Sequence, residues 1–191
     1  MEPLNQGVKM KAFETVGCCG IDCGLCPRFH TDGDSACPGC GGVYFKEKHP
    51  SCSILTCCVV KKGFVVCSDC DDYPCRRFDS ENEGYDSFVT HQKMFANLNA
   101  IKNNGLNQFI DKQRIRIGIL EDLLTHYNDG RSKGFFCLAS ALLPLDELQK
   151  LLPAMKKTDP ATDLREKNRL IKRSINGLAS RCGIELKLRK K

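Results

Sequence analysis

Twelve of the fourteen cysteines of this 191-residue chain are concentrated between Cys18 and Cys75, and only Cys137 and Cys182 lie beyond. The cysteine-rich stretch shows little apolar periodicity. It could hardly bury enough apolar surface to offset the conformational entropy lost on folding. Bonds made by the cysteine sulfurs must therefore supply much of its stability, either as disulfides or as ligands of metal ions.

The surroundings of the chain decide between these two chemistries. We find no run of about 18 apolar residues and no basic segment leading into an apolar one at the N-terminus, so we expect a cytoplasmic protein without membrane association. Thiols stay reduced in that compartment, which favours metal binding over a disulfide framework, the remaining alternative. A structural zinc site contributes on the order of 10 to 16 kcal/mol of apparent binding free energy, so one or two sites would be enough.

The strongest local pattern consists of two Cys-x2-Cys pairs. Cys23-Gly-Leu-Cys26 and Cys37-Pro-Gly-Cys40 are separated by ten residues. Pairs of this kind are typical of a four-thiolate zinc knuckle or ribbon, in which each tight turn presents two sulfurs to one ion. Residues 41–45 are predicted to leave this knuckle as a strand.

A second group of cysteines follows, with only one standard pair. It contains Cys52, Cys57, Cys67, Cys70 and Cys75, of which Cys67 and Cys70 form the pair. The β-prone residues 64–66 precede that pair. A scheme of two sites with four ligands each leaves Cys19 and Cys75 for a third or shared site, so we expect two or three Zn²⁺ ions. The spacing does not assign the ligand pairing.

Two further cysteines and two histidines are weaker ligand candidates. Cys18 and Cys58 each adjoin a better candidate, and adjacent cysteines rarely chelate one ion comfortably, so both are interpreted as spares. His30 and His49 lie near the cysteines in sequence, but the thiolates already suffice, and both are interpreted as exposed loop residues.

An iron–sulfur cluster is the alternative cofactor. Cys19-x3-Cys23-x2-Cys26 has the spacing found in radical S-adenosylmethionine enzymes. The chain lacks the strand–helix repeat and the length of their barrel, which argues against that class. An iron–sulfur electron-transfer protein without the barrel remains open, because Cys26-Pro27 and the many thiolates also suit such a cluster.

From residue 81 onward the sequence predicts a small helical bundle. Apolar residues recur at helical spacing through two stretches separated by Asn103-Asn-Gly105, the second running from Leu106 to Tyr127. Two shorter helices are expected over 135–143 and 145–155, with Cys137 as a small apolar core residue. We therefore expect a cysteine-rich metal-binding module over 1–80, a helical bundle over 81–155, and a basic helix and tail over 156–191.

The formal charge of +6 is a property of the C-terminal segment. A last helix is predicted to open at Thr158-Asp-Pro160, and one of its faces is basic. The basic residues are Arg165, Lys167, Arg169, Lys172 and Arg173, followed by the tail 187–191. A protein or nucleic-acid partner could bind here, but a solvated helix face is the simpler interpretation, because no aromatic residues interleave with the charges.

The order of these motifs resembles a prokaryotic family known only as a cysteine-rich domain of unknown function. The matching motifs, in chain order, are Cys19-Gly-Ile-Asp-Cys23-Gly-Leu-Cys26-Pro27, Cys37-x-Gly-Cys40, Cys52-x4-Cys57, Lys62-Gly63, Cys67-x2-Cys70, Tyr73-Pro-Cys75, Tyr127-Asn-x-Gly-Arg131 and Phe136-Cys137. The resemblance covers roughly residues 17 to 143 and implies metal binding through the ten cysteines of these motifs up to Cys75. Cys18 and Cys58 match no position of the pattern, and the family brings no established reaction.

Other signs of chemistry are scarce in the sequence. It contains no phosphate-binding Gly-x4-Gly-Lys-Ser/Thr loop, no dinucleotide fingerprint and no His-Glu-x2-His helix. Asp69, Asp71 and Asp72 are interpreted as solvated loop carboxylates. The sequence therefore predicts a mainly α protein with an N-terminal zinc-knuckle module that acts in binding or regulation. An iron–sulfur redox protein and a metal-dependent enzyme are the alternatives, and the sequence leaves enzymatic activity undecided.

Overall fold

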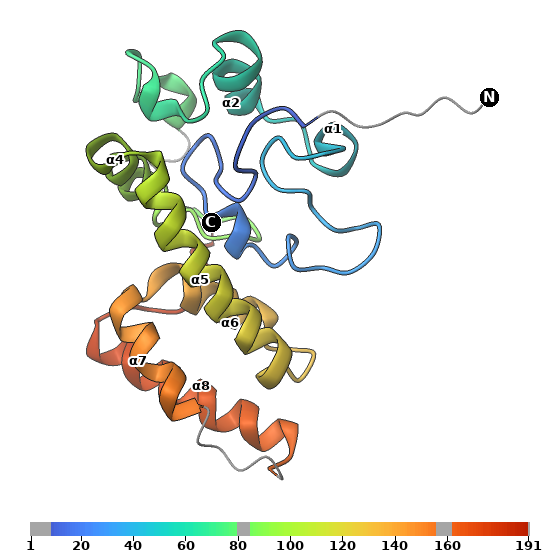
Figure 1. Ribbon diagram of the computed structural model, residues 1–191, viewed down its shortest axis with the longest axis vertical. Coiled ribbons are helices and arrows are strands. Elements are labelled where there is room, and N and C mark those ends of the chain that lie inside the picture. The colour runs from blue at the N-terminus through green and yellow to red at the C-terminus, as the bar shows by residue number, and fades with distance from the viewer. Residues whose placement is uncertain (1–8, 80–84, 156–161, 191) are drawn as a thin grey trace, which may run out of the picture.

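The computed structural model describes residues 9–79, 85–155 and 162–190 of a mainly helical protein (Figure 1). The long helix α5 (Leu106–Tyr127) runs from the cysteine-rich loops at one end to the bundle of α6, α7 and α8 at the other. The predicted domain boundaries after residues 80 and 155 adjoin segments outside the described residues. The predicted helix start at 158–160 also lies outside them.

The cysteine-rich half consists of loops joined by very short helices. These are η1 (Cys23–Leu25), α1 (Phe45–Lys48), α2 (Ser53–Leu55), the π-helical η2 (Thr56–Lys61), η3 (Cys67–Asp69) and η4 (Arg76–Phe78). The strand predicted over residues 41–45 is wrong, because Gly41 and Tyr44 have φ angles of 69° and 61° that turn the chain directly into α1. Residues 64–66 also form no strand, and the Phe64 amide instead donates to the carbonyl of Cys58 at 2.9 Å.

The predicted helices of the second half are confirmed. They are α4 (Met94–Asn104), α5, α6 (Lys133–Leu142), α7 (Leu145–Met155) and α8 (Leu164–Arg181). Gly105, with φ of 85°, makes the predicted break between α4 and α5. The α8 helix begins at Leu164, where the Asp163 carboxylate caps it by accepting from the amides of Arg165 and Glu166.

One hydrophobic core lies among the helices of the bundle. Leu120 of α5, Phe136 of α6 and Ile175 of α8 are almost completely buried in it. Cys137 lies in the same core with 2% of its surface exposed, which confirms its prediction as an apolar core residue. The helical half thus follows from amphipathic periodicity, since each helix buries one apolar face.

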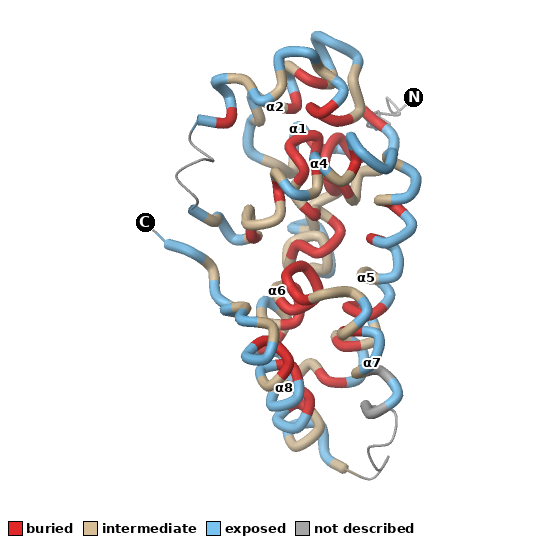
Figure 2. The backbone as a smooth tube through the Cα atoms, turned by 90° about the vertical axis from the view of Figure 1, so that its left-hand side faces the viewer, coloured by how far each residue is buried: buried red, intermediate tan, exposed pale blue. Residues whose placement is uncertain are grey.

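A second core joins the cysteine-rich loops to α4 and the start of α5. Val16 and Phe78 from the loops pack with Leu98 and Ile110 from these helices. Buried residues accordingly extend through the upper part of the molecule as well as through the bundle (Figure 2). The loops therefore use the neighbouring helices as part of their own core.

A buried polar network fixes the first cysteine loop on the helices. The Asp22 carboxylate accepts hydrogen bonds from Asn97 of α4 at 2.8 Å and from Gln113 of α5 at 2.9 Å. Asn97 also donates to the carbonyl of Gly20, and Gln113 to that of Thr15. Burial raises the pKa of Asp22, while the two amide donors and Arg116 oppose that shift. This network sets the position from which the cysteines of the loop project.

Candidate metal centre

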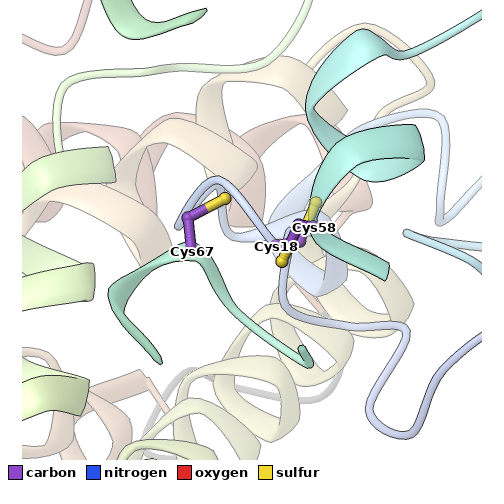
Figure 3. Close-up of side chains that lie close together, drawn as sticks. All are labelled: Cys18, Cys58 and Cys67. Atoms are coloured by element: carbon purple, nitrogen blue, oxygen red, sulfur yellow. The ribbon is translucent and has the colours of Figure 1, made fainter. Parts of the chain in front are cut away.

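Three sulfurs from three separate segments converge in the cysteine-rich half (Figure 3). The Sγ atoms of Cys18, Cys58 and Cys67 all lie within 4.8 Å of one another, and all three residues are buried. We call these three residues, together with Cys40, the buried thiol cluster, because the Cys40 sulfur lies 3.9 Å from that of Cys18. The cluster therefore unites chain segments that are far apart in sequence.

Local backbone structure brings these sulfurs together. The Cys67 amide donates to the carbonyl of Cys18 at 2.8 Å, which pairs the first loop with the start of η3. The Cys18 amide points at the Cys40 sulfur, 3.4 Å away. Cys58 lies in the π-helical turn η2, and insertions of this kind are frequent at functional sites because they redirect a side chain. The positions are thus fixed by backbone contacts as well as by the side chains.

Three sulfurs of the buried thiol cluster lie close enough together to suit one metal ion. In a zinc site with Zn–S bonds of about 2.3 Å, neighbouring sulfurs are about 3.8 Å apart. The Cys18–Cys40 separation of 3.9 Å is close to that value, and the sulfurs of Cys18, Cys58 and Cys67 lie within 4.8 Å of one another. Cys40 approaches this group at Cys18 and is not one of the three mutually close sulfurs. The residues present are therefore compatible with binding a metal ion through thiolates.

The thiols of the cluster differ in pKa. Hydrogen bonds with Cys18 and then with Cys67 lower the pKa of Cys58 to about 4, and a hydrogen bond with Cys18 lowers that of Cys40 to about 7. The same contacts raise the pKa of Cys18. Two of the four sulfurs are thus favoured as thiolates, which are the form that binds a metal.

A buried lysine lies beside the cluster. Lys11 is only 7% exposed, and its ammonium donates to the carbonyls of Val16 at 2.7 Å and Phe13 at 3.2 Å. Its positive charge also lowers the pKa of both Cys40 and Cys58. A Zn²⁺ ion with four thiolates carries a net charge of −2, and a fixed ammonium at this position offsets part of it.

A cavity of about 290 Å³ opens beside the cluster and is lined by seven cysteines. We call it the first thiol cavity, and its cysteines are Cys18, Cys19, Cys23, Cys26, Cys37, Cys40 and Cys52. Burial raises the pKa of Cys23 well above its ordinary value, and the charges of Cys40, Cys19, Cys26 and Cys37 add to this shift. The predicted ligands of the first motif thus lie around one space.

A second cavity of about 250 Å³ lies on the other side of the cluster. This second thiol cavity is lined by Cys57, Cys58, Cys67, Cys70 and Cys75. At its rim, Lys62 donates to the Cys70 sulfur at 3.1 Å and to Asp72 at 2.6 Å, and the hydrogen bond from Lys62 lowers the pKa of Asp72. Asp72 is therefore an exposed ion-pair partner of Lys62.

The structure divides the ten predicted ligands between these two cavities. All ten line one cavity or the other. Two of them, Cys40 and Cys67, also belong to the buried thiol cluster. The cluster also contains Cys18 and Cys58, which the sequence analysis set aside as spares. Two cysteines that are neighbours in sequence are expected to serve different sites. Their position in the sequence does not show which of the two enters the buried thiol cluster. None of the fourteen cysteines, all of which lie in the described residues, forms a disulfide.

The two histidines have different surroundings. His30 Nε2 lies 2.7 Å from the carbonyl of Gly24, so a hydrogen bond occupies this nitrogen. His49 stacks on Phe45 with ring centroids 4.4 Å apart and lines the first thiol cavity. His91, which no sequence pattern singled out, lines the same cavity from the segment before α4.

Part of the basic C-terminal segment is already engaged within the protein. Arg169 forms a two-pronged ion pair with Glu166. Lys172 lies over the ring of Phe135, 5.2 Å from its centroid. The tail returns to the segment before α4, where the Asp86 amide donates to the carbonyl of Arg189. The Asp86 carboxylate accepts a hydrogen bond from the Arg189 amide and pairs with its guanidinium. These contacts reduce the charge available to an outside partner.

Within the described residues, every helix falls short of the length or the apolar character that crossing a membrane requires. Comparisons with models of protein families, with curated proteins and with solved structures give no match to this chain. The chemistry of the site must therefore be derived from its own geometry.

Proposed function

We propose that the protein binds one Zn²⁺ ion in the buried thiol cluster and that this ion holds the cysteine-rich loops in a fixed arrangement for binding or regulation. The observation that carries the proposal is the convergence of the buried sulfurs of Cys18, Cys58 and Cys67 from distant segments, with the Cys40 sulfur 3.9 Å from that of Cys18. Four thiolates close the coordination sphere of zinc, as in structural rather than catalytic sites.

The resident residues have separable roles in this site. Cys18, Cys40, Cys58 and Cys67 would bind the ion, and Lys11 would offset part of the negative charge. Bound zinc supplies no redox chemistry, so its contribution is to cross-link the segments. The loops around the second core would gain order that their short helices could not provide alone.

Metal analysis of the purified protein tests this proposal. We expect one zinc per chain in the cluster, and Co²⁺ substituted for it should give the intense visible bands of a tetrahedral thiolate site. Cys58→Ser should abolish that signal, whereas Cys182→Ser, which changes a cysteine at the end of α8, should leave it unchanged. Full retention of the cobalt spectrum in Cys58→Ser would sink the proposal.

A further inference from the structure

The first thiol cavity contains more cysteines than the zinc site uses. Cys18 and Cys40 at its edge belong to the buried thiol cluster, and the Cys52 sulfur accepts the amide of Leu55 at the start of α2. Four thiols remain around the cavity without a role in the proposed function. They are Cys19, Cys23, Cys26 and Cys37.

These four sulfurs are not grouped as closely as those of Cys18, Cys58 and Cys67. Among the described residues, only Cys18, Cys58 and Cys67 form a set of three within 4.8 Å of one another, so no three of the four do. One zinc ion requires neighbouring sulfurs to lie about 3.8 Å apart. An iron–sulfur cluster holds its cysteines farther apart, because different cysteines bind different iron atoms and sulfide fills the space between them.

We propose that the first thiol cavity binds an iron–sulfur cluster of the four-cysteine class through Cys19, Cys23, Cys26 and Cys37. The site is distinct from the zinc site of the proposed function and does not depend on it. Its cavity of about 290 Å³ leaves room for a group larger than one ion. Cys19-x3-Cys23-x2-Cys26 supplies three ligands from one loop, and Cys37 supplies the fourth from the next.

Backbone hydrogen bonds position the segments that carry the proposed ligands of the iron–sulfur cluster. The Phe29 amide donates to the carbonyl of Cys26 at 3.0 Å, which closes a tight turn at this proposed ligand. The Cys37 amide donates to the carbonyl of Arg28 at 2.9 Å, which holds the fourth ligand beside the first loop. The Asp22 network then fixes this loop on α4 and α5.

Apolar side chains form part of the cavity wall. Ile21, Phe45, Ile54 and Val89 line it, together with residues 87, 88 and 91 of the segment before α4. The Asp86 carboxylate fixes that segment by accepting the amide of His91 at 2.6 Å and that of Arg189 at 2.8 Å. An apolar wall reduces the access of water to a cluster, and the contacts of Asp86 connect the returning C-terminal tail to this site.

The test uses the full chain, purified and reconstituted with iron and sulfide in the absence of oxygen. We expect about two to four iron atoms and as many sulfides per chain, with absorption near 400 nm and a ⁵⁷Fe Mössbauer spectrum of a thiolate-bound cluster, beside one zinc. Cys23→Ser should lose the iron signal and keep the zinc. Cys58→Ser should lose the zinc and keep the iron, and Cys182→Ser should keep both.

The possible outcomes separate the two sites. Zinc in the buried thiol cluster with no iron taken up by the unmutated chain would overturn this inference and leave the proposed function standing. Iron that survives in Cys23→Ser but is lost in Cys58→Ser would place the cluster elsewhere and overturn both assignments. Because the stoichiometry and the Mössbauer spectrum come from the unmutated protein, the test does not depend on the folding of any variant.

Discussion

Buried cysteines have different neighbours in the cysteine-rich half and in the helical half. Cys137 in the bundle is 2% exposed and lies among apolar side chains, whereas Cys18 in the loops is completely buried and lies against other sulfurs. Burial alone therefore does not distinguish a structural thiol from a ligand. The neighbours of the sulfur make the distinction, because only converging thiols can share an ion.

The two halves also differ in how they obtain stability. The bundle gains it from amphipathic helices, each of which buries a face against the others. The loops contain no described helix of two full turns and rely on α4, α5 and the cysteine sulfurs. If the proposed metal site is filled, the cysteine-rich half should depend on metal and the bundle should not.

Metal removal should have the largest effect. Stripping the protein with a strong chelator under reducing conditions should cost the cysteine-rich half on the order of 10 kcal/mol, because metal binding there is folding free energy. Hydrogen exchange should show lost protection across residues 16–78 and largely retained protection in α6 and α8. Equal loss of protection in both halves would show instead that the bundle cannot fold without the loops.

Replacing single cysteines should distinguish a cysteine that binds metal from one that packs in the hydrophobic core. Cys58→Ser should lower zinc affinity by orders of magnitude, because it removes one of four thiolates. Cys137→Ser should leave metal content unchanged and cost about 1 to 3 kcal/mol of unfolding free energy, because it buries a hydroxyl among apolar side chains. Metal content and denaturant unfolding measured on both variants check this contrast, and zinc loss in Cys137→Ser would contradict it.

Two glycines with the same backbone angle offer a matched test of loop packing. Gly39 and Gly33 both have φ of 78°, but a Cβ at Gly39 would come within 2.4 Å of the Glu14 carbonyl oxygen, while one at Gly33 meets nothing within 4 Å. Gly33→Ala should cost about 1 kcal/mol from backbone strain alone. Gly39→Ala should cost about 3 kcal/mol and weaken metal binding through its neighbour Cys40. Similar unfolding free energies for the two variants would show that Glu14 yields to the added methyl group.

The Asp22 network should give a smaller effect at the junction of the halves. Gln113→Leu removes the donor to Asp22 and to the Thr15 carbonyl, so we expect a loss of about 2 kcal/mol and a further rise in the pKa of Asp22. A folded-state pKa above the unfolded value means that the stability linked to Asp22 is fully present below the unfolded pKa. It falls as pH rises through the folded pKa.

The exposed Gln108 on the same helix provides the control for that change. Gln108→Leu should leave both the stability and the Asp22 titration near their original values, because its side chain faces solvent. Carboxyl NMR titration and denaturant unfolding measure the two effects. An unchanged Asp22 pKa in Gln113→Leu would rule out Gln113 as an effective donor to the carboxylate.

The helices could be predicted from sequence far better than the metal centre. Apolar spacing and the break at Gly105 located α4 to α7, because a helix depends on residues three and four positions apart. The buried thiol cluster depends on contacts between residues as distant as Cys18 and Cys67. Local spacing favoured the Cys-x2-Cys pairs and set aside Cys18 and Cys58. The strand predicted at 41–45 was wrong because Gly41 and Tyr44 take left-handed conformations that β-propensity does not register.

The anchoring of the first cysteine loop by Gln113 has a consequence for synthesis of the chain. The loop carries Cys18, Cys19, Cys23 and Cys26, but its hydrogen-bond partner on α5 is made about 90 residues later. At about 5 to 20 residues per second, the ribosome leaves these thiols without their final surroundings for roughly 5 to 20 seconds. During that interval they depend on reducing surroundings and on the timing of metal delivery. Correct maturation therefore requires α5 to be synthesised and packed before the thiols oxidise.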